Sequence, residues 1–166
     1  MWDAGSDGNE MDHHPYIGVI SDTHGLMRRE ALDALAGASL ILHAGDIGKP
    51  SVLEELREIA PVIAIRGNVD LGGWASHLPE YEWVDAQRVA IYMLHDIAGL
   101  SPSVAAKARV VISGHSHRPS IDERDGLLFL NPGSAGPRRF SLPITIARLW
   151  VADGVVGARV IDLGLS

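Results

Sequence analysis

The sequence predicts an α/β fold that opens with parallel strand–helix–strand units and closes with antiparallel strands. Three short apolar runs alternate with two helical patterns at the start, which is the order of a parallel sheet with right-handed crossovers. Four consecutive apolar runs end the chain, and Asp-Gly pairs at 125–126 and 153–154 predict tight turns. Trp, Tyr and Phe make up only 5% of the 166 residues. The core must therefore rest on Val, Ile, Leu and Ala, as in buried parallel strands.

The first half of the chain provides the parallel part of this fold. Gly37 near the end of the first helical pattern and Pro50 near the start of the second are placed as helix boundaries require. The predicted strands are residues 16–21, 39–46 and 61–68, and the predicted helices are residues 27–37 and 50–60.

In the second half, the regular alternation of strands and helices ends at a loop over residues 71–80 that is rich in Gly, Trp and Pro. A hairpin centred on Gln87 follows, then a short helix, a buried strand and the four closing strands. In order, these elements are strands 81–86 and 88–94, helix 101–108, strand 109–114, and strands 119–126, 127–134, 143–154 and 155–163.

Length and composition indicate one globular domain over residues 16–166, with 46% hydrophobic and 21% charged residues. Residues 1–15 lack periodicity and predict a mobile tail, native or added for expression, in which His13 and His14 are incidental.

The chain has no cysteine, which excludes disulfides and thiolate metal sites. No apolar run approaches the ~20 residues of a membrane span. The start of the sequence does not resemble a secretory signal, so we expect a cytoplasmic protein without membrane association.

The formal net charge of −7 argues against a sequence-independent nucleic-acid binder, which needs a basic face. It does not exclude a small substrate that carries phosphate. Bound metal ions can make the local field positive while the whole chain stays negative.

Polar side chains follow five of the predicted strands, at the point where each strand ends. They are Asp22-Thr23-His24, Asp46, Asn68, His95-Asp96 and His115-Ser116-His117. Ligands of open α/β sheets gather at the carboxyl ends of strands. Carboxylate, amide and imidazole groups at one sheet edge therefore predict a metal site.

The spacing within these groups supports that prediction. In extended backbone, residues two apart point the same way, which pairs Asp22 with His24 and His115 with His117. A glycine precedes three of the groups and permits sharp turns and close backbone approach. These glycines are Gly45, Gly67 and Gly114.

Each residue alone also has a simpler interpretation. Asp22 suits a helix cap, Asn68 a turn, and His95 a hydrogen-bonded core histidine. Their joint occurrence at the ends of strands in one sheet favours the metal site.

The ordered motifs SDTHG, HAGDI, GNVD, LHD, GHSHRP and NPGS resemble those of the calcineurin-like metallophosphoesterases. The resemblance is strongest to the compact bacterial and archaeal phosphodiesterase branch, and it runs from Tyr16 to the C-terminus. It implies a four-layer α/β/β/α sandwich with two mixed sheets and a dimetal site at the C-terminal ends of strands.

This resemblance implies seven ligands to two divalent metal ions. One ion would take Asp22, His24 and His117, the other Asn68, His95 and His115, and Asp46 would bridge both. The implied activity is hydrolysis of a small phosphoester, above all a phosphodiester, by a metal-bridging hydroxide that attacks phosphorus in line. The oxygen and imidazole ligands suit Mn, Fe, Ni, Co or Zn rather than Mg or Ca, and the resemblance favours Mn.

Two further residues are candidates for supporting roles beside the ligands. His43 could orient Asp46 or a bound water, although a packed core histidine is an equal alternative. Asp70 could hold a hydrogen bond behind the ligands or cap its own loop. The turn at 131–134 is expected to be structural.

Two positions depart from common family patterns. Val69 stands where many larger relatives have a histidine that assists the leaving group, so diesters with good leaving groups are the expected substrates. Asp96 stands where relatives usually have glycine. Its carboxylate either faces the second metal position or lies behind it, towards solvent.

A second function class follows from the same resemblance, because one relative of this fold serves retromer as a protein-interaction scaffold with an impaired site. All seven ligand positions are filled here, which favours the enzyme. A nuclease is disfavoured by the acidic charge. The sequence is also compatible with a homo-oligomer, and it does not name the natural substrate.

Overall fold

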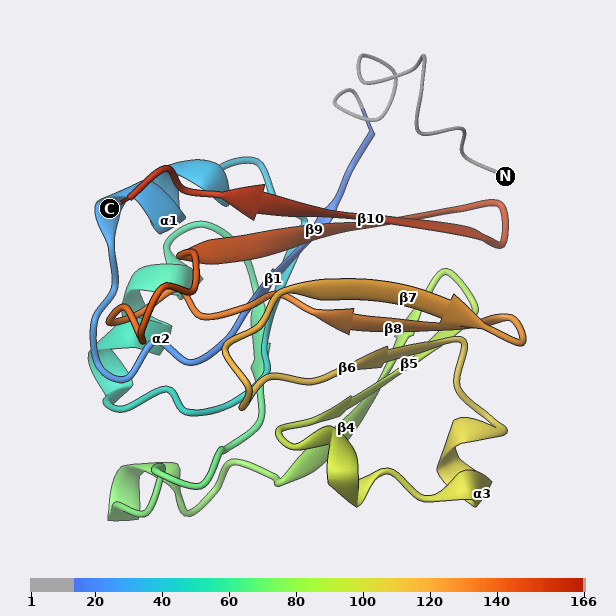
Figure 1. Ribbon diagram of the computed structural model, residues 1–166, viewed down its shortest axis with the longest axis horizontal. Coiled ribbons are helices and arrows are strands. Elements are labelled where there is room, and N and C mark those ends of the chain that lie inside the picture. The colour runs from blue at the N-terminus through green and yellow to red at the C-terminus, as the bar shows by residue number, and fades with distance from the viewer. Residues whose placement is uncertain (1–13, 166) are drawn as a thin grey trace.

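The computed structural model describes residues 14–165 and arranges them in four layers (Figure 1). Two five-stranded sheets pack against each other, and short helices lie on their outer faces. This confirms the α/β/β/α sandwich with two mixed sheets. The prediction of a tail over residues 1–15 falls almost wholly outside the described residues, as does His13.

The first sheet has the parallel strands from the start of the chain at its centre. Its order is β10-β9-β1-β2-β3, with β1 at Ile17–Ile20, β2 at Leu40–His43, β3 at Val62–Ala64, β9 at Thr145–Ala152 and β10 at Val155–Asp162. The strands β1, β2 and β3 run parallel, and β9 and β10 are antiparallel to their neighbours. The crossover helices are α1 (Arg29–Ala34) and α2 (Pro50–Arg57). Because α2 buries Val52, Leu53 and Leu56 along one side, it covers the outer face of this sheet.

The second sheet has the order β4-β5-β6-β8-β7 and is built from the later part of the chain. Its strands are β4 (Tyr81–Ala86), β5 (Val89–Leu94), β6 (Val110–Ile112), β7 (Ser120–Arg124) and β8 (Leu127–Asn131). The strands β5, β6 and β8 are parallel, whereas β4 and β7 form antiparallel edges. The short helix α3 (Pro102–Ala105) follows β5, and its residue Val104 packs on the outer face.

An apolar layer between the two sheets holds them in place. Val19 and Leu42 from the first sheet pack there with Ile91 and Ile112 from the second, and all four are fully buried. Burial of such a side chain stabilises the fold by roughly 1.5–3 kcal/mol. Because this layer fixes one sheet against the other, it also fixes the ends of strands from both sheets relative to each other.

The hairpin turns have the backbone that the sequence predicts. Asp125 and Gly126 both have positive φ, as do Asp153 and Gly154, which is the backbone of a type I′ turn. The hairpin around Gln87 is closed in the same way, although its second turn residue is an arginine rather than glycine.

Several elements are shorter than the sequence predicts. The strand predicted at 39–46 ends at His43, because Gly45 and Asp46 turn into left-handed backbone. The helix predicted at 101–108 spans only Pro102–Ala105, and a 3₁₀ turn, η3 (Ile97–Gly99), precedes it. A second such turn, η2 (Gly73–Ala75), lies within the predicted loop. Within the described part of the chain, no helix has the length and apolarity needed to cross a membrane.

Candidate metal centre

The seven predicted ligands lie on loops that follow five parallel strands, three from the first sheet and two from the second. Asp22 and His24 follow β1, Asp46 follows β2, Asn68 follows β3, His95 follows β5, and His115 and His117 follow β6. The sandwich brings these loops together because the ends of both sheets meet at one side of the shared core.

Three of these side chains form a first group. The carboxylate Oδ1 of Asp22 lies 3.3 Å from Nε2 of His117 and 3.8 Å from Nε2 of His24. The two imidazole Nε2 atoms are themselves 3.3 Å apart. Asp22 and His117 are buried, so three donor atoms converge in a space with little access to water.

A second group is centred on Asp46. Its Oδ2 lies 3.2 Å from Nε2 of His95 and 3.7 Å from Nε2 of His24. This oxygen therefore faces His24 of the first group as well as His95 of the second group. Asp22 Oδ1 also reaches towards His95, at the longer distance of 3.9 Å.

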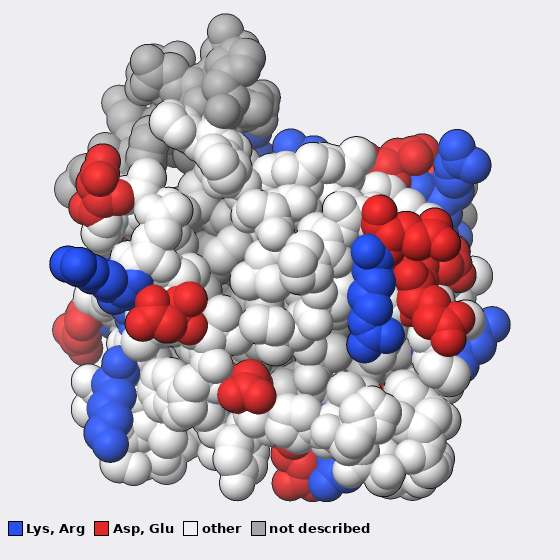
Figure 2. Space-filling view, turned by 180° about the vertical axis from the view of Figure 1, so that it is seen from behind, with Lys and Arg blue, Asp and Glu red and all other residues white. Residues whose placement is uncertain are grey.

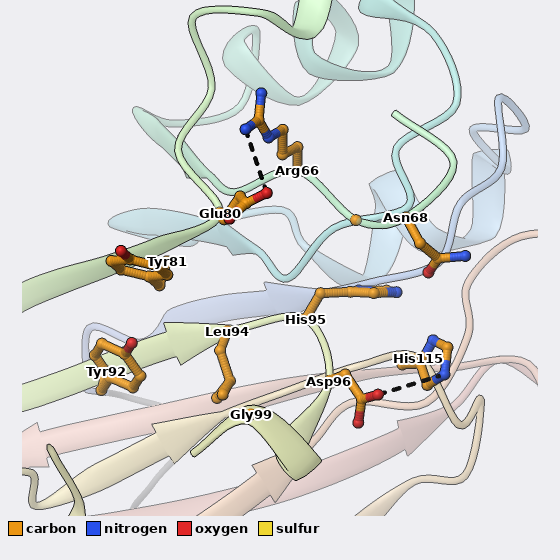
Figure 3. Close-up of a pocket in the computed structure, with 11 residues that line it drawn as sticks. Arg66, Asn68, Glu80, Tyr81, Tyr92, Leu94, His95, Asp96, Gly99 and His115 are labelled. Atoms are coloured by element: carbon orange, nitrogen blue, oxygen red, sulfur yellow. Dashed lines mark hydrogen bonds and ion pairs between the residues drawn. The ribbon is translucent and has the colours of Figure 1, made fainter. Parts of the chain in front are cut away.

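Asn68 and His115 lie on the open side of the second group. Figure 3 shows their side chains pointing towards the same space as the imidazole of His95, and all three line one hollow. The side chain of His115 is 47% exposed. The structure thus brings all seven predicted ligands to one place, five in close contact and two at the rim.

The polar atoms of the site fit a cation. Oδ1 of Asp22 and Nε2 of His95 are buried and have no hydrogen-bond partner among the described residues, although His95 lies close to Asp46. Nδ1 of His95 is 2.8 Å from the carbonyl oxygen of Ala44, so it carries the proton and leaves the Nε2 lone pair free. Buried carboxylates and lone pairs without partners are costly, and a divalent ion between them would offset that cost.

The pKa shifts of His117 and Asp46 suit metal ligation, whereas the pKa of His95 is raised in spite of its burial, above all by the contact with Asp46. Burial lowers the pKa of His117. The Asp22 carboxylate raises this pKa, whereas Arg139 and His24 lower it. The net effect is a lowered pKa, so the imidazole is neutral. Burial alone would raise the pKa of Asp46. The contacts with His95 and the Val69 N–H outweigh it and keep the pKa below its usual range.

The ligand loops differ from the extended backbone that the sequence pattern suggested. Asp22, His24, His115 and His117 all have φ between 47° and 68°, in the left-handed region. The two residues of each pair therefore do not project as neighbours along a strand. His117 joins Asp22 and His24, whereas His115 lies on the other side with His95.

Two glycines allow these loops to touch. A Cβ at Gly67 would overlap the Asp46 carboxylate, and a Cβ at Gly114 would overlap the hydroxyl of Ser21. The close backbone approach expected of the glycines before the ligands is thus present at both positions.

His43 lies behind the site and contacts no open space. It is fully buried, and Nδ1 accepts a hydrogen bond from the Gly45 N–H. The Thr23 hydroxyl donates to the carbonyl of Ile47, so it accepts from Nε2–H of His43. Burial lowers the pKa of His43 to about 3, with His95 as the next cause, so the ring is neutral. It ties the loop of Asp22 and His24 to the loop of Asp46.

Asp70 ties the same region from the other side. Its carboxylate accepts hydrogen bonds from three backbone N–H groups, those of Ile47, Gly48 and Gly67, at 3.0, 2.9 and 2.8 Å. Asp70 is 3% exposed. A single buried carboxylate therefore joins the loop that carries Asp46 to the loop that carries Asn68.

Three other residues support the ligand loops, and two of them lie in the turn at 131–134 that the sequence predicts to be structural. Ser21 donates to Oδ2 of Asp22 at 2.6 Å, which leaves Oδ1 for a metal. Asn131 donates to Gly114 and Ser116 and orders the loop of the last two histidines. Ser134 donates to the carbonyl of Asp22. Ser21 was not singled out, and its one signal in the sequence was its place in the motif SDTHG.

Asp96 lies beside the second group and also caps a turn. Its Oδ1 accepts from the N–H of Ala98 at the start of η3, and its Oδ2 is 3.8 Å from Nε2 of His115. The carboxylate thus faces His115 and the adjoining hollow, with half of its surface exposed.

The described surface does not offer a broad basic face in the view of Figure 2. Basic and acidic side chains alternate around the margin of that face, and its middle is mostly uncharged. This agrees with the acidic net charge of −7 and gives no footprint for a nucleic-acid backbone on this side.

Comparison with known proteins is consistent with this centre. Residues 16–154 match the calcineurin-like phosphoesterase superfamily domain. A protein of Methanothermobacter thermautotrophicus, named as a probable metallophosphoesterase, is 35% identical over 161 residues, covering 89% of this chain and 92% of its own.

Solved structures show the same fold. The structure of an archaeal phosphodiesterase superposes with a TM-score of 0.71 at 25% identity, over 88% of this chain and 99% of its own. Vps29 of Chaetomium thermophilum superposes with a TM-score of 0.73 at 21% identity, over 90% and 97%. The second likeness concerns the fold alone. On the matched domain and the relative's identity, the chain belongs to the calcineurin-like phosphoesterase superfamily.

Proposed function

We propose that the protein is a phosphodiesterase that works with two divalent metal ions. The observation that carries this proposal is the position of Asp46. Its Oδ2 faces His24 at 3.7 Å and His95 at 3.2 Å, so one carboxylate oxygen serves both halves of the site. The first ion would be held by Asp22, His24 and His117, the second by Asn68, His95 and His115, with Asp46 shared.

When bound, two divalent ions supply Lewis-acid chemistry, which lowers the pKa of water and neutralises charge on phosphoryl oxygens. The chain contributes two buried carboxylates, Asp22 and Asp46, against four positive charges. The loaded site would therefore keep an excess of about two positive charges and attract a phosphoester despite the acidic surface. Imidazole and oxygen donors suit Mn, Fe, Co, Ni or Zn, and we propose Mn.

Val69 supports a diester as the substrate. The residue is 44% exposed next to Asn68. Many larger relatives carry at this position a histidine that assists the leaving group. Valine cannot donate a proton to the departing oxygen, so the leaving group must be stable as an anion. Small phosphodiesters with acidic leaving groups are the proposed substrate class.

The test is a panel of phosphomonoesters and phosphodiesters, assayed with chelator-treated protein reloaded with each metal in turn. We expect hydrolysis of activated diesters that depends on metal, is greatest with Mn and is slower for monoesters. Tight metal binding without turnover of any ester would contradict the proposal and favour an interaction scaffold.

A further inference from the structure

A hollow of about 450 Å³ opens directly from the second ligand group. Asn68, His95 and His115 line one end of it, and Tyr81 and Tyr92 line the other (Figure 3). A substrate phosphate held by the ligands would therefore have one ester substituent next to this space. We call it the aromatic hollow. Its volume is within the range of pockets that bind small organic ligands.

The aromatic end arises from the pairing of β4 with β5. Tyr81 is opposite Leu94 and Trp83 is opposite Tyr92, so all four side chains project from the same face of the sheet. The rings of Trp83 and Tyr92 are 4.8 Å apart, and those of Tyr81 and Tyr92 are 6.3 Å apart. Tyr92 is thus held between two aromatic neighbours, while Tyr81 stays 61% exposed at the opening.

Charge in the hollow selects against a second anion. Among the described residues that line it, Arg66 is the one lysine or arginine, and it is paired with Glu80 at 3.3 Å. The Asp96 carboxylate lies between the ligand histidines and the apolar part, near His115. A second phosphate would meet this acid without a free cation, whereas a neutral planar group would meet aromatic and aliphatic surface.

We propose that the aromatic hollow binds a planar aromatic substituent of the phosphoester, either an aryl group or a nucleobase. This rests on the proposed function, because the metal centre must hold the phosphate. Tyr81 provides an exposed ring at the end away from the ligands, the buried Tyr92 supports it, and Leu94 with Gly99 forms the wall between.

The structure offers a substitution that fills the hollow without disturbing the ligands. A Cβ at Gly99 would meet only Leu94 Cδ1, at an ordinary 3.8 Å, and the backbone there is not left-handed. Gly99→Leu should therefore fold and occupy the hollow. Gly73→Leu is the matched control. It also lies in a 3₁₀ turn and meets nothing within 4 Å, but it lines the separate hollow of about 370 Å³ on the other side of Asn68.

The experiment is calorimetric binding of unreactive phosphonates to the metal-loaded protein. Methylphosphonate reports the metal centre alone, and phenylphosphonate and cyclohexylphosphonate add a flat or a puckered ring. The 5′-phosphonate analogue of thymidine 5′-monophosphate, compared with the same phosphonate of 1,2-dideoxyribose, tests the nucleobase in the same way.

We expect an aromatic ring to lower Kd about tenfold relative to its partner without the ring, with a smaller gain for cyclohexyl. Gly99→Leu and Tyr81→Ala should remove the gain and leave methylphosphonate unchanged, while Tyr81→Phe and Gly73→Leu should keep it. A gain for phenylphosphonate indicates that the substrate carries an aryl group, and a gain for the thymidine compound indicates a nucleobase. Equal affinities within both pairs, or loss of the gain in Gly73→Leu only, would overturn the inference while the proposed function stands. If methylphosphonate does not bind, both the proposed function and this inference are wrong.

Discussion

At the scale of single residues, the account depends on which atoms are left without protein partners. Asp22 has one oxygen hydrogen-bonded to Ser21 and the other facing three imidazoles. Asp46 has one oxygen hydrogen-bonded to the Val69 N–H and the other between His24 and His95. In both carboxylates the protein fixes one oxygen and leaves the other for a cation.

Asp46→Asn should weaken the binding of both ions, because it removes the one charge that both would share. Asp22→Asn is an isosteric comparison that should mainly affect the first ion, and His95→Ala should mainly affect the second. Calorimetric titration of Mn into each metal-free variant measures the two affinities separately. Two ions bound to Asp46→Asn as tightly as to the wild type would refute the bridging role.

Val69→His should accelerate esters with poor leaving groups more than those with good ones. The residue at 69 is 44% exposed beside Asn68, so an imidazole can be accommodated there. General acid catalysis typically contributes ~10²–10⁴-fold. The measurement is a series of aryl phosphodiesters of increasing leaving-group pKa, run on both proteins. A wild-type rate that is independent of leaving-group pKa while chemistry limits the rate would show that another acid acts at the site.

At the scale of elements, the ligand loops are held together by two buried side chains. Asp70 joins the loop after β2 to the loop after β3, and His43 joins the loop after β1 to the loop after β2. Both side chains are buried, so their contribution should be visible in stability as well as in metal binding.

Asp70→Asn should lower the free energy of unfolding by about 2–3 kcal/mol. The carboxylate accepts hydrogen bonds from three backbone N–H groups, whereas an amide in its place would point its own NH₂ group at one of them. Metal affinity should fall roughly 10–100-fold, as for other residues that orient ligands. Asp33→Asn on α1, an exposed carboxylate, is the control and should change neither quantity. Denaturant unfolding and metal titration give the two values. Unchanged metal affinity in a destabilised Asp70→Asn would limit Asp70 to a structural role.

His43 makes the stability of the metal-free protein depend on pH. Its pKa is about 3 in the fold and about 6.5 when unfolded, so the unfolded chain binds more protons between these values. Stability should therefore fall as pH drops below about 6.5, by about 2 kcal/mol from this group at pH 5. His43→Asn removes the titration and keeps an acceptor for Gly45. Unfolding free energies at pH 7 and pH 5 should differ less in the variant than in the wild type; an equal difference would assign the pH dependence to other groups.

Much of this organisation could be predicted from the sequence. Apolar runs located the strands, and the Asp-Gly pairs located two hairpins, because both signals are local. The polar groups after five strands could be located for the same reason, and the family resemblance then implied which seven of their residues are ligands. The grouping could not be derived from spacing. All four residues of the two pairs adopt left-handed backbone, yet Asp22 and His24 lie in one group, whereas His115 and His117 lie in different groups.

At the scale of the whole molecule, the site exists only because two sheets from different parts of the chain pack together. Ligands from β1, β2 and β3 meet ligands from β5 and β6 across the apolar layer between the sheets. The aromatic hollow depends on the same packing, since it lies between the loop after β3 and the face of β4 and β5. Such contacts between distant segments have no local sequence signal, so the sequence pattern does not indicate that Tyr81 and Tyr92 lie beside the metal centre.

The central claim is that two divalent ions bind at this meeting of the sheets and are both required for phosphodiester hydrolysis. Titration of Mn into the metal-free protein, with bound metal and diester turnover measured on the same samples, tests it most directly. The account predicts that turnover rises until two ions are bound per chain and then stays constant. Full turnover with one ion per chain, or turnover in the metal-free protein, would contradict it.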